Sequence, residues 1–328
     1  MAGVLVLVQG GGAETPPATI ELIVAGRRVA DELGAAPLTA LVAGKDVAGM
    51  ASALGQYGVE RVLVAEDPSP APLSPAWLLA AAQQAATEVA PDVVLLSHIA
   101  AGRELGPSLA ARLNTGIVTD CTGLRVADGL LVMTKPVFGG SAVAEMAVTG
   151  TPQMATLRPR AFASDAAPTP RQAVVETLAT AADPAAEGVE VLEEVQAQTG
   201  AGPRLKDAKV IVAGGRGIGS AENWHYVEEL ADVLGAAVGA SRAVTDAGWV
   251  PPSLQVGLTG ATVAPDLYVT VGISGAVQHV AGISGARNVV AINRDGDANI
   301  FKYARYGVVG DWKQIVPALT QRLRELRV

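Results

Sequence analysis

A Gly-Ser-Gly turn in the last quarter of the sequence has residue types and a spacing suited to binding an anion. The apolar run 267–271 leads into Gly272-Ile-Ser-Gly275 and then into residues at helical spacing, which predicts a strand, a tight turn and a helix. The first backbone N–H groups of such a helix have no partner within it and lie at the positive end of the helix dipole. Ser274 can cap the helix or contact a phosphate, and His279 adds a titratable nitrogen one turn later. The turn therefore predicts a site for a phosphate-bearing cofactor.

The same residue types can also have a purely structural role. Strand-turn-helix units with glycine and serine occur in many α/β proteins that bind nothing at the turn. Gly282-Ile-Ser-Gly285 repeats the motif after a predicted helix, where its glycines are better explained as the end of that helix. The surrounding sequence has to distinguish the two interpretations.

Several other predicted strands of the second half end in polar residues. The run 208–214 leads into a Gly-rich turn, 236–238 leads into Gly-Ala-Ser-Arg, and 288–293 and 306–311 end in Asn and Asp. Ligands of open parallel sheets bind at the carboxyl ends of the strands. The sequence therefore predicts one rim formed by Arg216, Ser241, Arg242, Ser274, Asn293 and Asp311.

The glycine spacing separates classes of cofactor. An NAD-binding fold needs Gly-x-Gly-x-x-Gly and, some twenty residues later, an acid for the ribose hydroxyls. Here the glycines are Gly215, Gly217 and Gly219, and the next strand is followed by Ser241 and Arg242. This pattern disfavours NAD and favours another anionic ligand.

Two α/β domains are needed to position these residues. Apolar runs alternate with amphipathic stretches over residues 1 to about 160, a pattern typical of a mostly parallel sheet covered by helices. In this half we expect strands at 4–8, 38–42, 61–64, 92–97 and 153–158, and glycine-bent strands within 130–147. Helix boundaries are predicted from an N-cap at Thr19 with a stop at Gly34, an N-cap at Ser74 followed by Pro75, and an N-cap at Ser220 with a stop at Gly235.

A composition change marks the connection between the domains. Residues 161–204 are rich in Ala, Pro, Thr and Glu, with breakers at 165–170 and 199–203, and the stretch 188–195 could add a strand to the first domain. We predict an α/β fold with an N-terminal domain over 1–200, without a cofactor of its own, and a second domain over 204–328, each with a mostly parallel sheet flanked by helices.

Composition excludes several classes of function. The net charge of −8 argues against nucleic acid, which needs a basic face. No apolar run is long enough to span a bilayer, so we expect no membrane insertion and a cytoplasmic location. With Cys121 as the single cysteine, no internal disulfide and no thiolate metal cluster can form, and we expect no metal site.

The motifs of the second half, taken in order, resemble the FAD-binding domain of the electron-transfer flavoprotein alpha subunit. The similarity covers residues 209–317, whereas the first half is similar in architecture and in a Pro-Val-Phe-Gly-Gly segment. The motifs are Gly214-Gly-Arg-Gly217, Ser220-Ala-Glu-Asn223, Gly239-Ala-Ser-Arg-Ala-Val-Thr-Asp246, Gln255-Val-Gly with Thr259-Gly, Val271-Gly-Ile-Ser-Gly-Ala-Val-Gln-His279, Ala291-Ile-Asn-Arg-Asp295 and 307–311.

The resemblance implies a role for each part of the site. It implies a Rossmann-like domain in which Arg216, Ser241 and residues 274–276 hold the pyrophosphate of FAD, and Asn293, Asp311 and Trp312 face its adenosine. Arg242, Thr259 and His279 would surround the flavin ring, where a cation favours the negatively charged reduced flavin. The complete set of implied cofactor-binding residues is Arg216, Ser241, Arg242, Val256, Gly257, Leu258, Thr259, Ser274, Gly275, Ala276, Val277, Gln278, His279, Asn293, Asp311 and Trp312.

The resemblance also implies partners. The chain would pair with an electron-transfer flavoprotein beta subunit carrying AMP or a second FAD, accept electrons from flavin dehydrogenases of the acyl-CoA dehydrogenase type, and pass them to a quinone-linked oxidoreductase. The alternatives are a subunit of an electron-bifurcating, NADH-linked flavoprotein, an NAD-dependent dehydrogenase and a non-redox nucleotide-binding regulator. One departure concerns the ring: Leu258 and Ala261 stand where the family usually has Gln and Lys, which affects the expected potential more than FAD binding.

Overall fold

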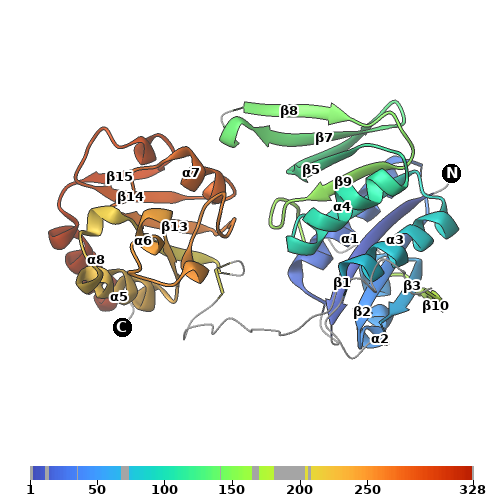
Figure 1. Cartoon of the computed structure of the whole chain (residues 1–328), viewed down its shortest axis with the longest axis horizontal. Helices are drawn as coiled ribbons and strands as arrows, with labels where there is room; N and C mark the ends of the chain where they lie inside the picture. The colour runs from blue at the N-terminus through green and yellow to red at the C-terminus, as the bar shows by residue number, and fades with distance from the viewer. Residues whose placement is uncertain are drawn as a thin grey trace. The chain divides into compact units, whose positions relative to one another are not determined.

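The computed structural model describes residues 3–11, 15–34, 36–67, 74–140, 142–164, 170–180, 204–205 and 208–326. The chain forms two compact units (Figure 1). One comprises Met1–Val137 with Ser141–Glu194, and the other comprises Val195–Val328 with Phe138–Gly140. The predicted α/β class with two mostly parallel sheets is confirmed.

The first unit is built around a seven-stranded parallel sheet in the order β10-β3-β2-β1-β4-β9-β5. Its strands are β1 (Val4–Gly11), β2 (Leu38–Lys45), β3 (Arg61–Glu66), β4 (Val93–Ser97), β5 (Ile117–Cys121), β9 (Gln153–Leu157) and β10 (Val174–Thr177). Its helices are α1 (Pro17–Glu32), α2 (Ala48–Ala53), α3 (Pro75–Val89) and α4 (Ala100–Arg112).

Both faces of this sheet are covered, which explains its continuous apolar strands. Along β1, Val4 and Val6 point into a core shared with α1 and α2. Leu5 and Leu7 point to the other face, where α3 and α4 pack. Cys121 lies in the first of these cores, and burial raises the pKa of its thiol to about 12, so it is a packing residue.

A smaller antiparallel sheet belongs to the same unit. It consists of β6 (Gly123–Ala127), β7 (Leu130–Val137) and β8 (Ala142–Ala147) in that order. Residues 138–140 separate the last two strands, and Gly139 and Gly140 both have positive φ there, which confirms the predicted glycine bend.

The second unit has a five-stranded parallel sheet in the order β12-β11-β13-β14-β15. Its strands are β11 (Val210–Gly214), β12 (Ala237–Ala240), β13 (Leu267–Val271), β14 (Val289–Asn293) and β15 (Tyr306–Val309), and its helices are α5 (His225–Leu234), α6 (Arg242–Thr245), α7 (Val277–Ile283) and α8 (Trp312–Leu326). Helices α5 and α8 pack on one face, while the loop before β13, α7 and Ile300 pack on the other.

The β15 strand forms one edge of that sheet. Among the described strands it pairs only with β14, and all four of its residues are exposed, including Tyr306 and Val309 at 62% and 61%. This strand therefore leaves both an open backbone edge and apolar side chains in contact with solvent.

The predicted helix boundaries are confirmed at some positions and wrong at others. Ser74 caps α3 with Pro75 as its first residue, and Gly235 ends α5 in the left-handed conformation. Thr19 is not an N-cap, because α1 already begins at Pro17. Ser220 does not cap α5 either, since a 3₁₀ turn over 221–224 separates them and its side chain makes no capping bond.

Three predictions for the connection fall outside the described residues: the breaker at 165–170 except its last residue, the added strand at 188–195 and the breaker at 199–203. The domain limits at 200 and 204 therefore stay predictions. No helix among the described residues is long and apolar enough to cross a membrane.

Candidate functional site

The carboxyl ends of the five strands of the second sheet meet at one edge. Gly214 at the end of β11 is paired with Ala240 on one side and with Val271 on the other. Ile292 of β14 is paired with Val271 and with Val308 of β15. The turns 214–218, 240–242 and 271–276, which we call the carboxyl edge, are therefore neighbours, as the sequence predicted from parallel pairing.

The Gly-Ser-Gly turn is fastened through its carbonyl groups. Asn293 Nδ2 donates to the carbonyl of Ile273 at 2.9 Å, and Asn299 Nδ2 donates to that of Gly275 at 2.7 Å. The backbone N–H of Ile300 donates to the carbonyl of Ser274 at 3.0 Å. Because three successive carbonyls are held on one side, the peptide N–H groups of the turn face away from these partners.

Those N–H groups are the anion-binding feature of the edge. Among the described residues, the backbone N–H groups of 274–278 have no hydrogen-bond partner; the first bonded amides are those of His279 and Val280, both to Ala276. Ala276 is the N-cap of α7, and Ser274 makes no capping bond, so of its two predicted uses capping is wrong. An anion placed against this turn would satisfy donors that the fold leaves open.

Glycine is required where the turns approach each other. A Cβ on Gly217 would lie 2.8 Å from the Cα of Gly272, and the N–H of Gly217 donates to the carbonyl of Gly272 at 3.0 Å. A Cβ on Gly275, which has φ +83°, would lie 2.6 Å from the Cα of Ile300. The closeness of these backbones depends on the absence of side chains.

Two arginines give the edge positive charge. Arg216 follows β11 and is exposed, with no ion pair among the described side chains. Arg242 opens α6 with 66% of its side chain exposed, and its Nε lies 3.2 Å from Oδ2 of Asp246. This exposed pair is weak, so Arg242 remains able to face an anionic ligand.

A hydrogen-bonded chain orders the loop 255–261 beside the edge. The Thr245 hydroxyl lies 2.9 Å from the carbonyl of Arg242 and 2.8 Å from Oε1 of Gln255. Gln255 Nε2 donates to Oγ1 of Thr259 at 3.0 Å. The Leu258 N–H donates to the carbonyl of Gln278 at 2.8 Å, which ties the loop to α7.

His279 is turned into the core of the second unit. It is 6% exposed, and its Nε2 lies 3.1 Å from the hydroxyl of the fully buried Tyr268. Burial lowers its pKa to about 4, although the carbonyl of Val256 opposes the shift. In the protein as described, His279 is neutral near pH 7, so it is not a resident cation.

The remaining predicted residues divide into exposed and internally bonded groups. Leu258, Thr259, Ser274, Ala276, Val277 and Gln278 are exposed, and Ser241 is half-buried as the N-cap of α6, whereas Val256, Gly257 and Gly275 are buried. Asn293 holds the turn, and Asp311 Oδ1 accepts the N–H of Lys313 at 3.0 Å. Trp312 is buried, and its Nε1 donates to the carbonyl of Gly217 at 3.0 Å.

Sequence reasoning missed the residues that support the site. Asn299 lies outside the quoted motifs, and Thr245 and Gln255 lie within two of them but were given no role, because their partners are backbone or distant side chains. Tyr268 had a usable signal, because a tyrosine in the middle of a buried strand needs a partner for its hydroxyl.

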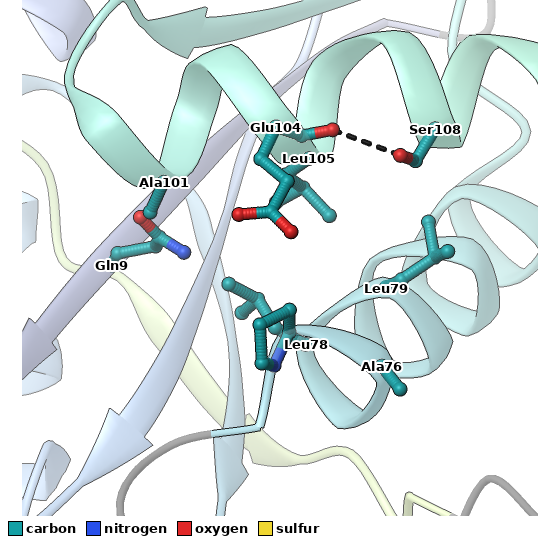
Figure 2. A pocket seen from close by; sticks show the side chains of 9 residues that line it. Gln9, Ala76, Leu78, Leu79, Ala101, Glu104, Leu105 and Ser108 are labelled. Carbon is teal, nitrogen blue, oxygen red and sulfur yellow. Dashed lines mark hydrogen bonds between the residues drawn. The ribbon is translucent and has the colours of Figure 1, made fainter. Parts of the chain in front are cut away.

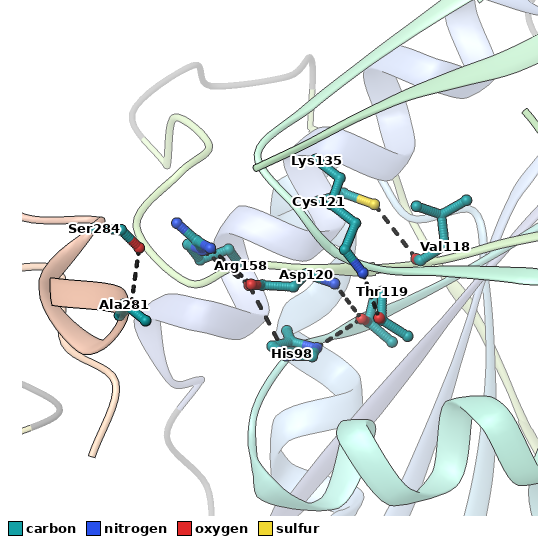
Figure 3. Close-up of polar contacts among 10 residues, drawn as sticks. His98, Val118, Thr119, Asp120, Cys121, Lys135, Arg158, Ala281 and Ser284 are labelled. Carbon is teal, nitrogen blue, oxygen red and sulfur yellow. Dashed lines mark hydrogen bonds and ion pairs between the residues drawn. The ribbon is translucent and has the colours of Figure 1, made fainter. Parts of the chain in front are cut away.

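The first unit holds a separate polar cluster at the ends of β5 and β9 (Figure 3). Arg158 bonds Asp120 with both Nε and Nη2, at 2.8 and 2.7 Å. Burial raises the pKa of Asp120, but the bonds and charge of Arg158 outweigh it and hold the pKa below its usual value. His98 Nδ1 lies 2.8 Å from the Thr156 hydroxyl. The groups of this cluster therefore satisfy one another.

A pocket of about 260 Å³ lies elsewhere in that unit, between α3 and α4 (Figure 2). Gln9 near the end of β1, with Glu104 and Ser108 of α4, are its polar lining residues, and Leu78 and Leu105 are among the apolar ones. None of the predicted cofactor-binding residues lines it.

Two family models match most of the chain. The model described as electron transfer flavoprotein domain covers residues 4–183, and the one described as electron transfer flavoprotein FAD-binding domain covers 204–284.

Curated relatives match over nearly the full length. The chain is 39% identical to an electron transfer flavoprotein subunit alpha of Bacillus subtilis, covering 99% of this chain and 98% of the relative. It is 40% identical to a protein FixB of Clostridium saccharobutylicum, covering 99% and 97%. It is 39% identical to an electron transfer flavoprotein subunit alpha of Thermoanaerobacterium thermosaccharolyticum, covering 94% and 93%.

Proposed function

Because the chain belongs to the electron transfer flavoprotein alpha-subunit family, we propose that it is the FAD-carrying subunit of a heterodimeric electron-transfer flavoprotein. It accepts electrons from flavin dehydrogenases of the acyl-CoA dehydrogenase type and passes them to a quinone-linked oxidoreductase. The partner is the beta subunit, which carries AMP or a second FAD. Two of these relatives are named subunit alpha, a name that implies a second kind of subunit and so supports such a pairing.

The observation that carries this proposal is the carboxyl edge with its open backbone N–H groups. Residues 274–278 present backbone donors without partners in the part of the chain that the structure describes, and the Gly217–Gly272 approach brings a second turn against the first. Arg216 adds an exposed positive charge. This donor set fits the two negatively charged phosphates of FAD, so we propose that Arg216, Ser241 and residues 274–276 hold the pyrophosphate.

The flavin end of the site is proposed to lie beside the loop 255–261. FAD supplies the exchange of one or two electrons, and the chain supplies orientation and charge. Arg242 is the fixed cation that favours added negative charge, and Thr259, oriented by Gln255, offers a hydroxyl. Leu258, 65% exposed, presents an apolar side chain at the same loop. His279, buried next to Gly257 of this loop, provides a neutral imidazole rather than a cation.

Asn293 and Asp311 are proposed to face the adenosine from the ends of β14 and beyond β15. Both keep an oxygen at this end of the sheet, although each oxygen already accepts a local backbone N–H. Trp312 supports the edge by its bond to Gly217.

Co-expression with the beta subunit tests the proposal. The purified complex is expected to be yellow, to release FAD on denaturation, and to be reduced by an acyl-CoA dehydrogenase with its substrate. A colourless complex that does not bind added FAD would refute the cofactor assignment. Reduction by NADH but not by the dehydrogenase would favour the bifurcating alternative.

A further inference from the structure

A tyrosine and a histidine form an isolated polar pair inside the second unit. Tyr268 is the second residue of β13, the strand that leads to the Gly-Ser-Gly turn, and it is 0% exposed among apolar side chains that include Ile211, Val263 and Ile283. Its hydroxyl lies 3.1 Å from Nε2 of His279, and the two ring centroids are 6.0 Å apart with planes tilted by 52°. The pair links β13 to α7.

The charge states of the two groups limit this hydrogen bond to two arrangements of its proton, because both groups are neutral. Burial raises the pKa of Tyr268 well above its ordinary value, so its hydroxyl keeps its proton. His279 is neutral, because burial lowers its pKa to about 4 and no charged side chain contributes to the shift. A neutral imidazole has one donor and one acceptor nitrogen. With the hydroxyl as donor, Nε2 is the acceptor and the ring proton resides on Nδ1.

The other side of the ring agrees with this tautomer. Nδ1 is buried and has no partner that meets hydrogen-bond geometry among the described residues. The carbonyl of Val256 interacts with the ring and raises its pKa, and Nδ1 is the ring nitrogen that Tyr268 leaves open. Val256 opens the stretch proposed to bind the flavin ring, so the orientation of the imidazole is coupled to that loop.

We propose that Tyr268 is a positioning residue for His279, whose hydroxyl fixes the imidazole as the neutral tautomer protonated on Nδ1. The relevance of this tautomer to electron transfer rests on the proposed FAD site. The Tyr268–His279 hydrogen bond does not depend on that site. The flavin end of the proposed site then combines the cation of Arg242 with a neutral imidazole dipole of set orientation. The hydroxyl can also accept from Nε2–H, so the pair can host a proton if negative charge is placed beside it.

The tautomer can be measured directly by nitrogen NMR. The sample is the full chain, labelled with ¹⁵N-histidine and purified with its beta subunit. This chain has three histidines, and comparison with His279→Gln assigns the signals of His279. Wild-type His279 is expected to show a pyridine-type Nε2 and a protonated Nδ1 at pH 7. Tyr268→Phe keeps the ring and removes only the hydroxyl. Because one hydrogen bond is lost, the tautomer ratio is expected to change about three- to tenfold.

Thr270→Val is the matched control. Thr270 lies two residues further along β13 on the same face, is 0% exposed, and has a buried hydroxyl without a partner. Its substitution removes a hydroxyl from the same strand and is expected to leave the His279 signals unchanged.

The outcomes separate a positioning role from a structural one. The inference would be overturned if Tyr268→Phe left the His279 signals unchanged. It would also be overturned if the wild-type ring carried its proton on Nε2, or were charged, at pH 7. If Tyr268→Phe does not fold, the wild-type tautomer still decides. The measurement on FAD-stripped protein tests the pair alone, whereas failure to bind FAD would refute the proposed function and leave the tautomer result standing.

Discussion

Gly275→Ala is expected to damage both stability and cofactor retention, because two separate costs arise at this position. The backbone has φ +83°, where a side chain costs about 1 kcal/mol relative to glycine. The new Cβ would also lie 2.6 Å from the Cα of Ile300 and 2.8 Å from the carbonyl carbon of Asn299, so backbone must move. Overpacking of this kind costs a further 1–3 kcal/mol or so, giving roughly 2–4 kcal/mol in total.

Gly235→Ala separates the two costs. Gly235 has φ +60° at the end of α5, but a Cβ there would meet no atom within 4 Å. Its substitution should therefore cost only about 1 kcal/mol. Urea unfolding of both variants gives the difference, and the FAD content of the purified complexes shows whether displacement of the turn weakens binding. Equal destabilisation by the two substitutions, with full FAD retention by Gly275→Ala, would refute the reasoning.

Two further substitutions test the charges of the site. Arg242→Ala should retain FAD and lower the potential for the first electron by tens of millivolts, since an exposed cation contributes on the order of 1–2 kcal/mol and about 1.4 kcal/mol equals about 59 mV. A redox titration measures the potential, with the exposed Arg287→Ala as the control. Unchanged potentials in Arg242→Ala would contradict the prediction. His279 has a folded-state pKa of about 4 against an ordinary 6.5, so the unfolded chain binds more protons in between, and stability present above pH 6.5 should fall by about 2 kcal/mol between pH 7 and pH 5. In urea unfolding, His279→Gln should lose much of this dependence while the exposed His225→Gln keeps it; an unaltered dependence in His279→Gln would show that the histidine is not held neutral by the fold.

Helix starts could be predicted where one residue type decides them. Ser74 and Pro75 act through local geometry, and the structure has them as the N-cap and first residue of α3. At α1, two consecutive prolines precede Thr19, and Pro17 begins the helix because its fixed φ suits that position. The prediction that Ser220 caps α5 was wrong for another reason. Residues Ala221–Trp224 form a tighter 3₁₀ turn before α5, which an amphipathic pattern does not reveal.

The site was predictable as far as it depends on strand order. Parallel strands place Gly214, Ala240 and Val271 side by side in the sheet, so the turns that follow them had to meet. The direction of a side chain within a short helix was not predictable. His279 follows three exposed residues of the same turn, but its ring contacts the buried Tyr268, and Gly257 packs against α7 with its Cβ position 3.5 Å from the Cα of His279.

Internal hydrogen bonds were the least predictable part. Asn299 bonds Gly275 from the start of a 3₁₀ helix 24 residues later in the chain, and Gln255 joins Thr245 to Thr259. Such partners depend on tertiary distances that no local pattern encodes.

The exposed β15 strand has a practical consequence for producing this chain without its partner. The open edge of β15 carries Tyr306, Val308 and Val309 in contact with solvent. Its backbone groups can therefore pair with a strand of another copy of the chain. Concentrated preparations of the unpartnered chain will therefore tend to aggregate through this edge. A single lysine in place of Val309, which is 61% exposed, would disfavour such stacking without disturbing the core, and would make the isolated subunit easier to handle.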